Sequence, residues 1–235
     1  MSLPSSEHHT PTLVAPAASD VVVLGKLSPS LSAPLEEETP LFSADSSFAY
    51  QEGGKWTQAF LDGLPAAWQT EHLIVDSLLV WLQRDQSLPS RWYHHEVFPW
   101  AQNRGYGLAN AERDVEHIVC AFGAPSVREF LLGTPSPSNA LLPFDLYQTP
   151  EKDFAQRHAW LRAQREAGQL RTLEIGLGVM HRFDGRTFQR AVATAVPGFH
   201  FYIRATRGSG RPIVNGRCNV IARTSTGPWT ASFIP

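Results

Sequence analysis

Short apolar segments separated by turn residues recur along most of this chain, and this pattern limits the available folds most strongly. The segments have the length of β-strands, and turns such as Asp184-Gly185 and Pro197-Gly198 separate them. Many short strands with such turns favour a sandwich or a barrel over a layered α/β fold. The expected strands cover Leu73 to Leu82, Glu116 to Phe122, Val127 to Leu132, Leu170 to Leu177, Phe199 to Ala205 and Pro212 to Ala222.

Two helices are expected beside these strands. Thr57 to Leu64 carries apolar residues on one side and is followed by Pro65, which ends a helix. A second helix follows Thr149, which is suited to the N-cap position, and it stops at Gly168. This second helix is expected to pack against the outside of a mainly β body.

Residues 1–45 are rich in Pro, Ser and Ala and are expected to form an N-terminal arm or linker before a single β domain over residues 46–235. One apolar run in the arm, Val21 to Leu24, suits an edge strand. Two roles for the arm stay open. It is either a loosely held tail or a segment that docks on a neighbouring subunit and makes a homo-oligomer.

The charge and apolar content of the chain exclude several classes of partner. The formal net charge is −2 with a pI near 6.5, so nothing attracts the whole chain to nucleic acid or to an anionic membrane. No apolar run approaches the roughly 20 residues that span a bilayer, and the N-terminus lacks the pattern of a secretion signal. Cys120 and Cys218 lie in strand-like runs and read as buried thiols, which predicts a cytoplasmic protein.

Two polar clusters are candidates for chemistry. In a strand, alternate residues share a face, so His94 and Glu96 of the run Arg91-Trp-Tyr-His-His-Glu96 would point the same way. An imidazole and a carboxylate placed like this can offer two ligands to one metal, although the same tripeptide also suits a solvated strand face. Arg204, on the polar side of a late strand, can grip a carboxylate or form a strand-end salt bridge.

The order of several motifs resembles a group of uncharacterised bacterial and phage-type proteins. That group is similar to the double-stranded β-helix, a cupin-like jelly roll, of the Fe(II)/2-oxoglutarate oxygenases. The resemblance covers most of the chain and implies a jelly-roll fold with a few packing helices. It rests on Thr57…Phe60-Leu61-Asp62-Gly63-Leu64-Pro65, Val75-Asp76-Ser77, Trp92-Tyr93-His94-His95-Glu96 and Gly198-Phe199-His200-Phe201-Tyr202-Ile203-Arg204-Ala205.

The resemblance also implies a site for Fe(II) and 2-oxoglutarate. His94 and Glu96 correspond to the first histidine and the acid of the metal motif, and Arg204 corresponds to the arginine that holds the distal carboxylate of 2-oxoglutarate. The distal histidine position falls on Gln189, whose amide oxygen is a poor Fe(II) ligand beside imidazole. His181, near the start of the same expected hairpin, ranks first among the substitutes for that ligand.

Two functions stay open on the sequence. In the first, Fe(II) and 2-oxoglutarate support the hydroxylation of a small-molecule or protein substrate that the sequence does not identify. In the second, a metal-free jelly roll has a binding or structural role, for example in an assembly. Gln189 favours the scaffold, whereas the presence of His94, Glu96 and Arg204 favours the oxygenase.

Overall fold

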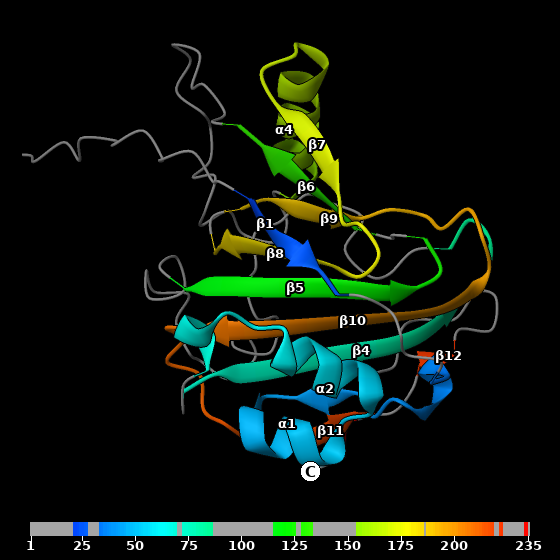
Figure 1. Ribbon diagram of the computed structural model, residues 1–235. Helices are drawn as coiled ribbons and strands as arrows, with labels where there is room; N and C mark the ends of the chain where they lie inside the picture. The colour runs from blue at the N-terminus through cyan, green and yellow to red at the C-terminus, as the bar shows by residue number, and fades with distance from the viewer. Residues whose placement is uncertain are drawn as a thin grey trace, which may run out of the picture.

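The computed structural model describes residues 21–27, 33–69, 72–86, 115–125, 128–133, 154–185, 187–218, 221–222 and 233–234. Over these ranges the chain is mainly β, as the sequence predicts, with antiparallel sheets and three α-helices (Figure 1). No helix in the described ranges has the length and apolar character needed to cross a membrane.

A seven-stranded sheet forms the centre of the fold, with the order β1-β8-β5-β10-β4-β12 and with β3 also paired to β4. The long strand β10 pairs antiparallel with β4 on one side and with β5 on the other, and it holds the sheet together. Only β12 runs parallel to its neighbour among the described pairs of this sheet. The strands are β1 (Val22–Lys26), β3 (Ala44–Asp45), β4 (Ile74–Leu82), β5 (Glu116–Gly123), β8 (Val179–Asp184), β10 (Gly198–Arg207) and β12 (Ile221–Ala222).

Two smaller sheets complete the described β structure. The first, called here the β6 sheet, has the order β7-β6-β9, and the second has the order β13-β11-β2. Both are antiparallel. Their strands are β6 (Arg128–Leu132), β7 (Arg171–Glu174), β9 (Gln189–Ala191), β2 (Leu41–Phe42), β11 (Gly216–Cys218) and β13 (Phe233–Ile234).

The β6 sheet faces one side of the seven-stranded sheet, which we call the inner face. Val119 of β5 and Phe183 of β8 pack there against Phe130 of β6, and the rings of Phe130 and Phe183 lie 4.8 Å apart. Because side chains alternate along a strand, the register places His117, Tyr202 and the other even-numbered residues of β10 on this face.

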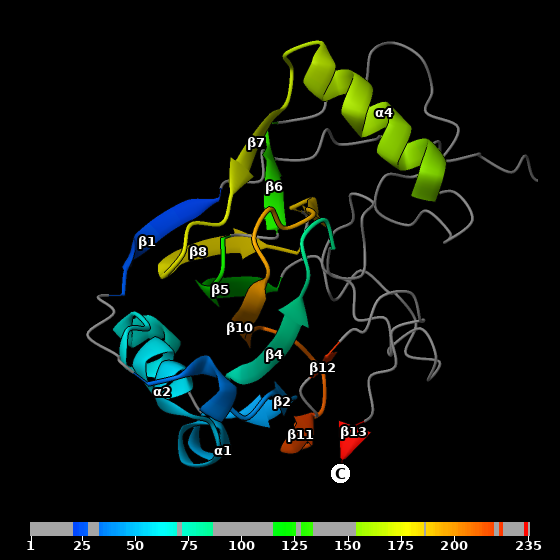
Figure 2. The same ribbon diagram turned by 90° about the vertical axis from the view of Figure 1, so that its right-hand side faces the viewer.

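Helices cover the two outer sides of this pair of sheets (Figures 1 and 2). Helices α1 (Ser46–Glu52) and α2 (Lys55–Asp62) contribute Ala49 and Phe60 to the large core on the outer side of the seven-stranded sheet. Helix α4 (Phe154–Glu166) covers the β6 sheet through Leu161, which contacts Leu131. Short 3-10 turns, η1 (Leu35–Glu37) and η2 (Ala66–Trp68), flank the first two helices.

The N-terminal segment is built into the sheets where the structure describes it. Strand β1 lies at the edge of the seven-stranded sheet beside β8, as the apolar run at Val21 to Leu24 indicates. Residues 41–45, on the arm side of the expected boundary, pair with β4 and β11. The elements α1, β8, β9 and β13 also lie outside the expected helices and strands.

Candidate functional site

The five residues singled out from the sequence divide into two groups. His94 and Glu96 lie outside the described residues. Gln189 begins β9, His181 lies in β8 and Arg204 lies in β10. All three are buried.

Gln189 and His181 are both neighbours of Phe130. Gln189 is the register partner of Phe130 in the β6 sheet, and directly opposed residues share a face. The ring of Phe130 lies 6.1 Å from that of His181, which extends from β8. The fold therefore brings these two sequence-predicted residues into the same space between the sheets.

A guanidinium holds the amide of Gln189. Arg128 of β6 donates from Nη1 to Gln189 Oε1 at 3.2 Å. The same guanidinium lies 4.6 Å from the ring centroid of Tyr202, which is on the inner face of β10. The hydrogen bond and the cation–π contact together fix the amide oxygen toward a positive charge.

His181 is held in one tautomer by the backbone. Its Nδ1 lies 3.0 Å from the carbonyl oxygen of Val179, which can only accept, so Nδ1 carries the proton and Nε2 keeps its lone pair. Burial lowers the pKa of His181, although the bond to Val179 opposes this effect. The imidazole is therefore neutral at neutral pH, which is the form that binds a metal.

Arg204 forms an ion pair with a carboxylate of the chain itself. Its Nη2 donates to Asp76 Oδ2 at 2.9 Å, and Arg211 Nη2 donates to the same oxygen at 2.6 Å. The register pairs Arg204 with Asp76 across β10 and β4, so both extend from the inner face. The other oxygen of Asp76 accepts from the backbone N–H of Ser43 at 2.9 Å.

Asp76 is ionised although only 17% of its side chain is exposed. Burial raises its pKa, but the guanidiniums of Arg211 and Arg204 outweigh this effect and bring the pKa to about 2. The sequence names Asp76 only within the Val75-Asp76-Ser77 motif. The signal that could have indicated this ion pair is an aspartate inside an otherwise apolar strand, since a charge in such a place needs a partner.

This depressed pKa predicts acid sensitivity. The ordinary value is 3.8 and the folded value is about 2, so the stabilisation is complete above pH 3.8 and is lost as the pH falls toward 2. The shift corresponds to roughly 2 kcal/mol of unfolding free energy. Urea unfolding across this acid range should show this loss, and Asp76→Asn should remove that part of the pH dependence. An unchanged pH slope in the variant would contradict the assignment.

Among the described residues, no hydrogen-bond partner is found for the buried atoms His117 Nε2, His200 Nε2 and Tyr202 Oη of the inner face. The other ring nitrogen of His117 lies 3.0 Å from the Thr206 hydroxyl. Burial lowers the pKa of His117 to about 3 and that of His200 to about 4, so both rings are neutral. The sequence singled out none of these three atoms as a site, because their burial depends on the sheet above them.

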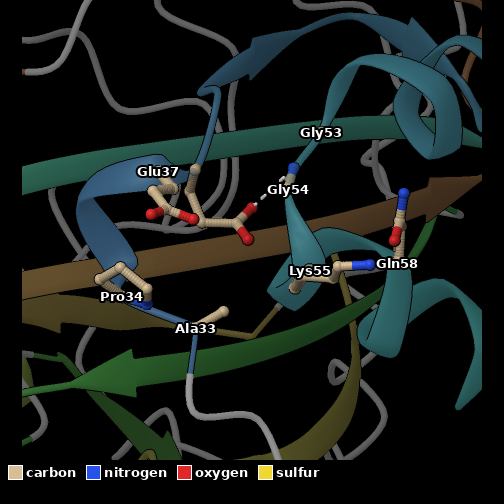
Figure 3. A pocket seen from close by; sticks show the side chains of 8 residues that line it. Ala33, Pro34, Glu37, Gly53, Gly54, Lys55 and Gln58 are labelled. Carbon is tan, nitrogen blue, oxygen red and sulfur yellow. Dashed lines mark hydrogen bonds between the residues drawn. The ribbon is translucent and has the colours of Figure 1, made fainter.

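A pocket of about 230 Å³ lies away from the inner face, between η1 and the start of α2 (Figure 3). Glu38 enters it and caps the helix. Its carboxylate accepts from the backbone N–H groups of Gly54, Trp56 and Thr57 at 3.2, 2.6 and 3.3 Å, and from the Thr57 hydroxyl at 2.8 Å. These contacts satisfy backbone groups that a helix start leaves open, so the pocket is explained as a capping site.

Among the described residues, no three His, Cys, Asp or Glu side chains come together in a metal-binding group. No protein-family model matches this chain. No curated protein matches it either. Among solved structures, the chain is similar to a non-heme monooxygenase, the ThoJ–Ni complex. The identity is 10%, 71% of each chain is covered and the TM-score is 0.30.

Proposed function

We propose that this protein is a double-stranded β-helix scaffold, built on the plan of the Fe(II)/2-oxoglutarate oxygenases, that binds a ligand between its sheets without using iron. The strand order supports the jelly roll. Along the chain, β5, β8 and β10 belong to the seven-stranded sheet, and β6, β7 and β9 belong to the facing β6 sheet. Strands that alternate between two facing antiparallel sheets in this way are typical of jelly rolls.

The positions implied by the resemblance fall inside this arrangement. Gln189 and Arg204 lie on the consecutive strands β9 and β10, one in each of the two facing sheets. His181 extends into the same space beside Phe130. His94 and Glu96 belong to residues 87–114, between β4 and β5, and their part in the site stays a prediction.

The distal metal position does not fit Fe(II). A metal ligand must direct a lone pair at the ion, but Gln189 Oε1 accepts a hydrogen bond from Arg128. A divalent ion at this oxygen would lie beside the Arg128 guanidinium, and the like charges would repel each other. A 2-oxoglutarate carboxylate at Arg204 would likewise have to replace Asp76. The Arg128–Gln189 hydrogen bond is the observation that carries the metal-free proposal.

Anaerobic titration with Fe(II) and 2-oxoglutarate tests the proposal. The wild-type protein should give no visible charge-transfer band. Gln189→His should restore an imidazole, but iron affinity should rise strongly only when Arg128→Met also removes the positive charge. Glu174→Gln, on an exposed part of β7, is the matched control. A wild-type band that His94→Ala abolishes would overturn the scaffold and establish an iron protein.

One observation favours the oxygenase as a second candidate. The tautomer of His181 leaves Nε2 able to accept, and Nδ1 is held by the Val179 carbonyl, as is typical of metal-binding histidines. In that case His94, Glu96 and His181 would hold the metal, and Gln189 would not be a ligand. A charge-transfer band that is lost in His181→Ala and kept in Gln189→Ala would favour this candidate.

A further inference from the structure

We infer that His117 is an acid-sensitive lock at the centre of the seven-stranded sheet, which stabilises the pairing of β5 with β10 only while its imidazole is neutral. This inference concerns the folded state itself. It goes beyond the proposed function, since it holds whether or not a ligand binds between the sheets. Three observations support it: the position of the ring, its hydrogen bonds and the charges around it.

The first observation is that the ring of His117 lies where three strands meet. His117 belongs to β5, which lies between β8 and β10 (Figure 1), and 0% of the residue is exposed. It is the register partner of Thr206 in β10 and of Phe183 in β8, so strands enclose it on both sides. The rings of His117 and Phe183 lie 5.0 Å apart. Protonation would therefore place a charge in a packed, water-excluded part of the inner face.

The second observation is that the hydrogen bonds of the ring suit its neutral form. Nδ1 lies 3.0 Å from the Thr206 hydroxyl, which can donate to this nitrogen or accept from it. No hydrogen-bond partner is found for Nε2 among the described residues. An imidazolium carries two N–H donors and needs two acceptors, whereas the described residues supply one at most. A proton taken from the solvent onto this ring would leave a charged donor buried without an acceptor, which is costly.

The third observation concerns the titratable groups around the ring. In the described elements these are Asp76 of β4, Arg204 of β10, Arg211 of the loop after β10 and the neutral His181 of β8. Burial is the largest effect on His117 and opposes a proton; Asp76 favours the proton, and Arg211 opposes it. The Asp76 carboxylate already accepts from both arginines. The net effect lowers the pKa of His117 to about 3.

The lowered pKa gives the direction of the effect. The ordinary value is 6.5 and the folded value is about 3, so the unfolded chain takes up the proton first as the pH falls. The stabilisation that neutral His117 provides is complete above pH 6.5 and is lost as the pH falls toward 3. The Asp76 carboxylate acts in a lower range, below pH 3.8. Mild acid therefore loosens the sheet through His117 before the ion pairs of Asp76 are lost.

Urea unfolding of the full chain between about pH 6 and pH 4 tests the inference. Over this range the equilibrium constant for unfolding should rise about 50- to 100-fold more in wild type than in His117→Asn, because asparagine is polar but does not titrate. His181 and His200 are buried as well, so only this difference between the two proteins isolates His117. Asp76→Asn is the matched control and should keep the wild-type slope over this range, because its effect lies below pH 3.8.

A measurement on the wild-type protein keeps the test independent of whether the variant folds. In the folded state, the ring signals of His117 in NMR spectra should show no titration down to about pH 4. A titration midpoint of the folded ring near its ordinary value of 6.5 would overturn the inference. Equal pH slopes of unfolding in wild type and His117→Asn would overturn it too. His117→Gln, with a larger amide, repeats the comparison with a smaller loss of volume.

Discussion

Asp76→Ala should lower the free energy of unfolding by about 3–5 kcal/mol, the largest effect expected of any single substitution considered for this protein. The carboxylate joins three parts of the chain that are distant in sequence. It accepts from Arg204 in β10, from Arg211 in the loop after β10, and from the backbone of Ser43 between β2 and β3. Its removal would take this carboxylate away from two buried guanidiniums, and removing one partner of a buried ion pair is strongly destabilising.

Urea unfolding followed by circular dichroism measures this effect. Asp62→Ala is the matched control, because Asp62 is exposed at the end of α2, and it should change stability by less than about 0.5 kcal/mol. Asp76→Asn keeps the shape and one acceptor oxygen, so it should fall between the two. A loss of less than about 1 kcal/mol in Asp76→Ala would show that the ion pairs contribute little.

Glu38→Ala should have the second largest effect, a loss of about 3 kcal/mol. The carboxylate accepts from three backbone N–H groups at the start of α2 and from the Thr57 hydroxyl. Only 4% of Glu38 is exposed, so water has little access to this carboxylate. Alanine would therefore leave the donors without their acceptor in a largely buried environment. Because α2 contributes Phe60 and Leu61 to the main core, loosening its first turn also disturbs the packing.

Glu36→Ala is the matched control for this substitution. Glu36 lies two residues earlier in η1 and is exposed, so its loss should be nearly neutral. Glu38→Gln should recover part of the stability, since an amide oxygen still accepts but carries no charge to favour the helix start. Equal stability of Glu38→Ala and Glu36→Ala would contradict the capping role. Hydrogen exchange at Trp56 and Thr57 would report the same bonds locally.

The expected strands reflect local physics and are largely confirmed. The segments at β4, β5, β6 and β10 carry the apolar patterns that a sheet buries, and turns with Gly or Pro separate several of them. Strand β8 was missed because His181, Arg182 and Asp184 interrupt its apolar residues, and its burial comes from neighbours on both sides. Helix α1 was missed because it is short, although Asp45 caps it by accepting from the Phe48 N–H at 2.7 Å.

For the candidate site, the sequence identified which types of residue belong to it and the order in which they follow along the chain. It singled out Gln189, His181 and Arg204, and the fold brings all three to the space between two sheets. Their partners were not predictable from spacing. Arg128 is 61 residues from Gln189, and Asp76 is 128 residues from Arg204, so only strand pairing and the facing of the sheets bring them together.

By itself, the sequence determined a mainly β body with turn-separated strands, because the alternation of side chains and the conformations of Gly and Pro act over a few residues. The tertiary structure alone decided which charged and polar groups bind one another. Arg204 and Arg211 form ion pairs with Asp76. Arg128 donates a hydrogen bond to Gln189, and Glu38 accepts from the backbone at the start of α2. The physical reason is that the energy of a buried charge depends on which groups lie within a few ångströms, and these neighbours come from distant parts of the chain.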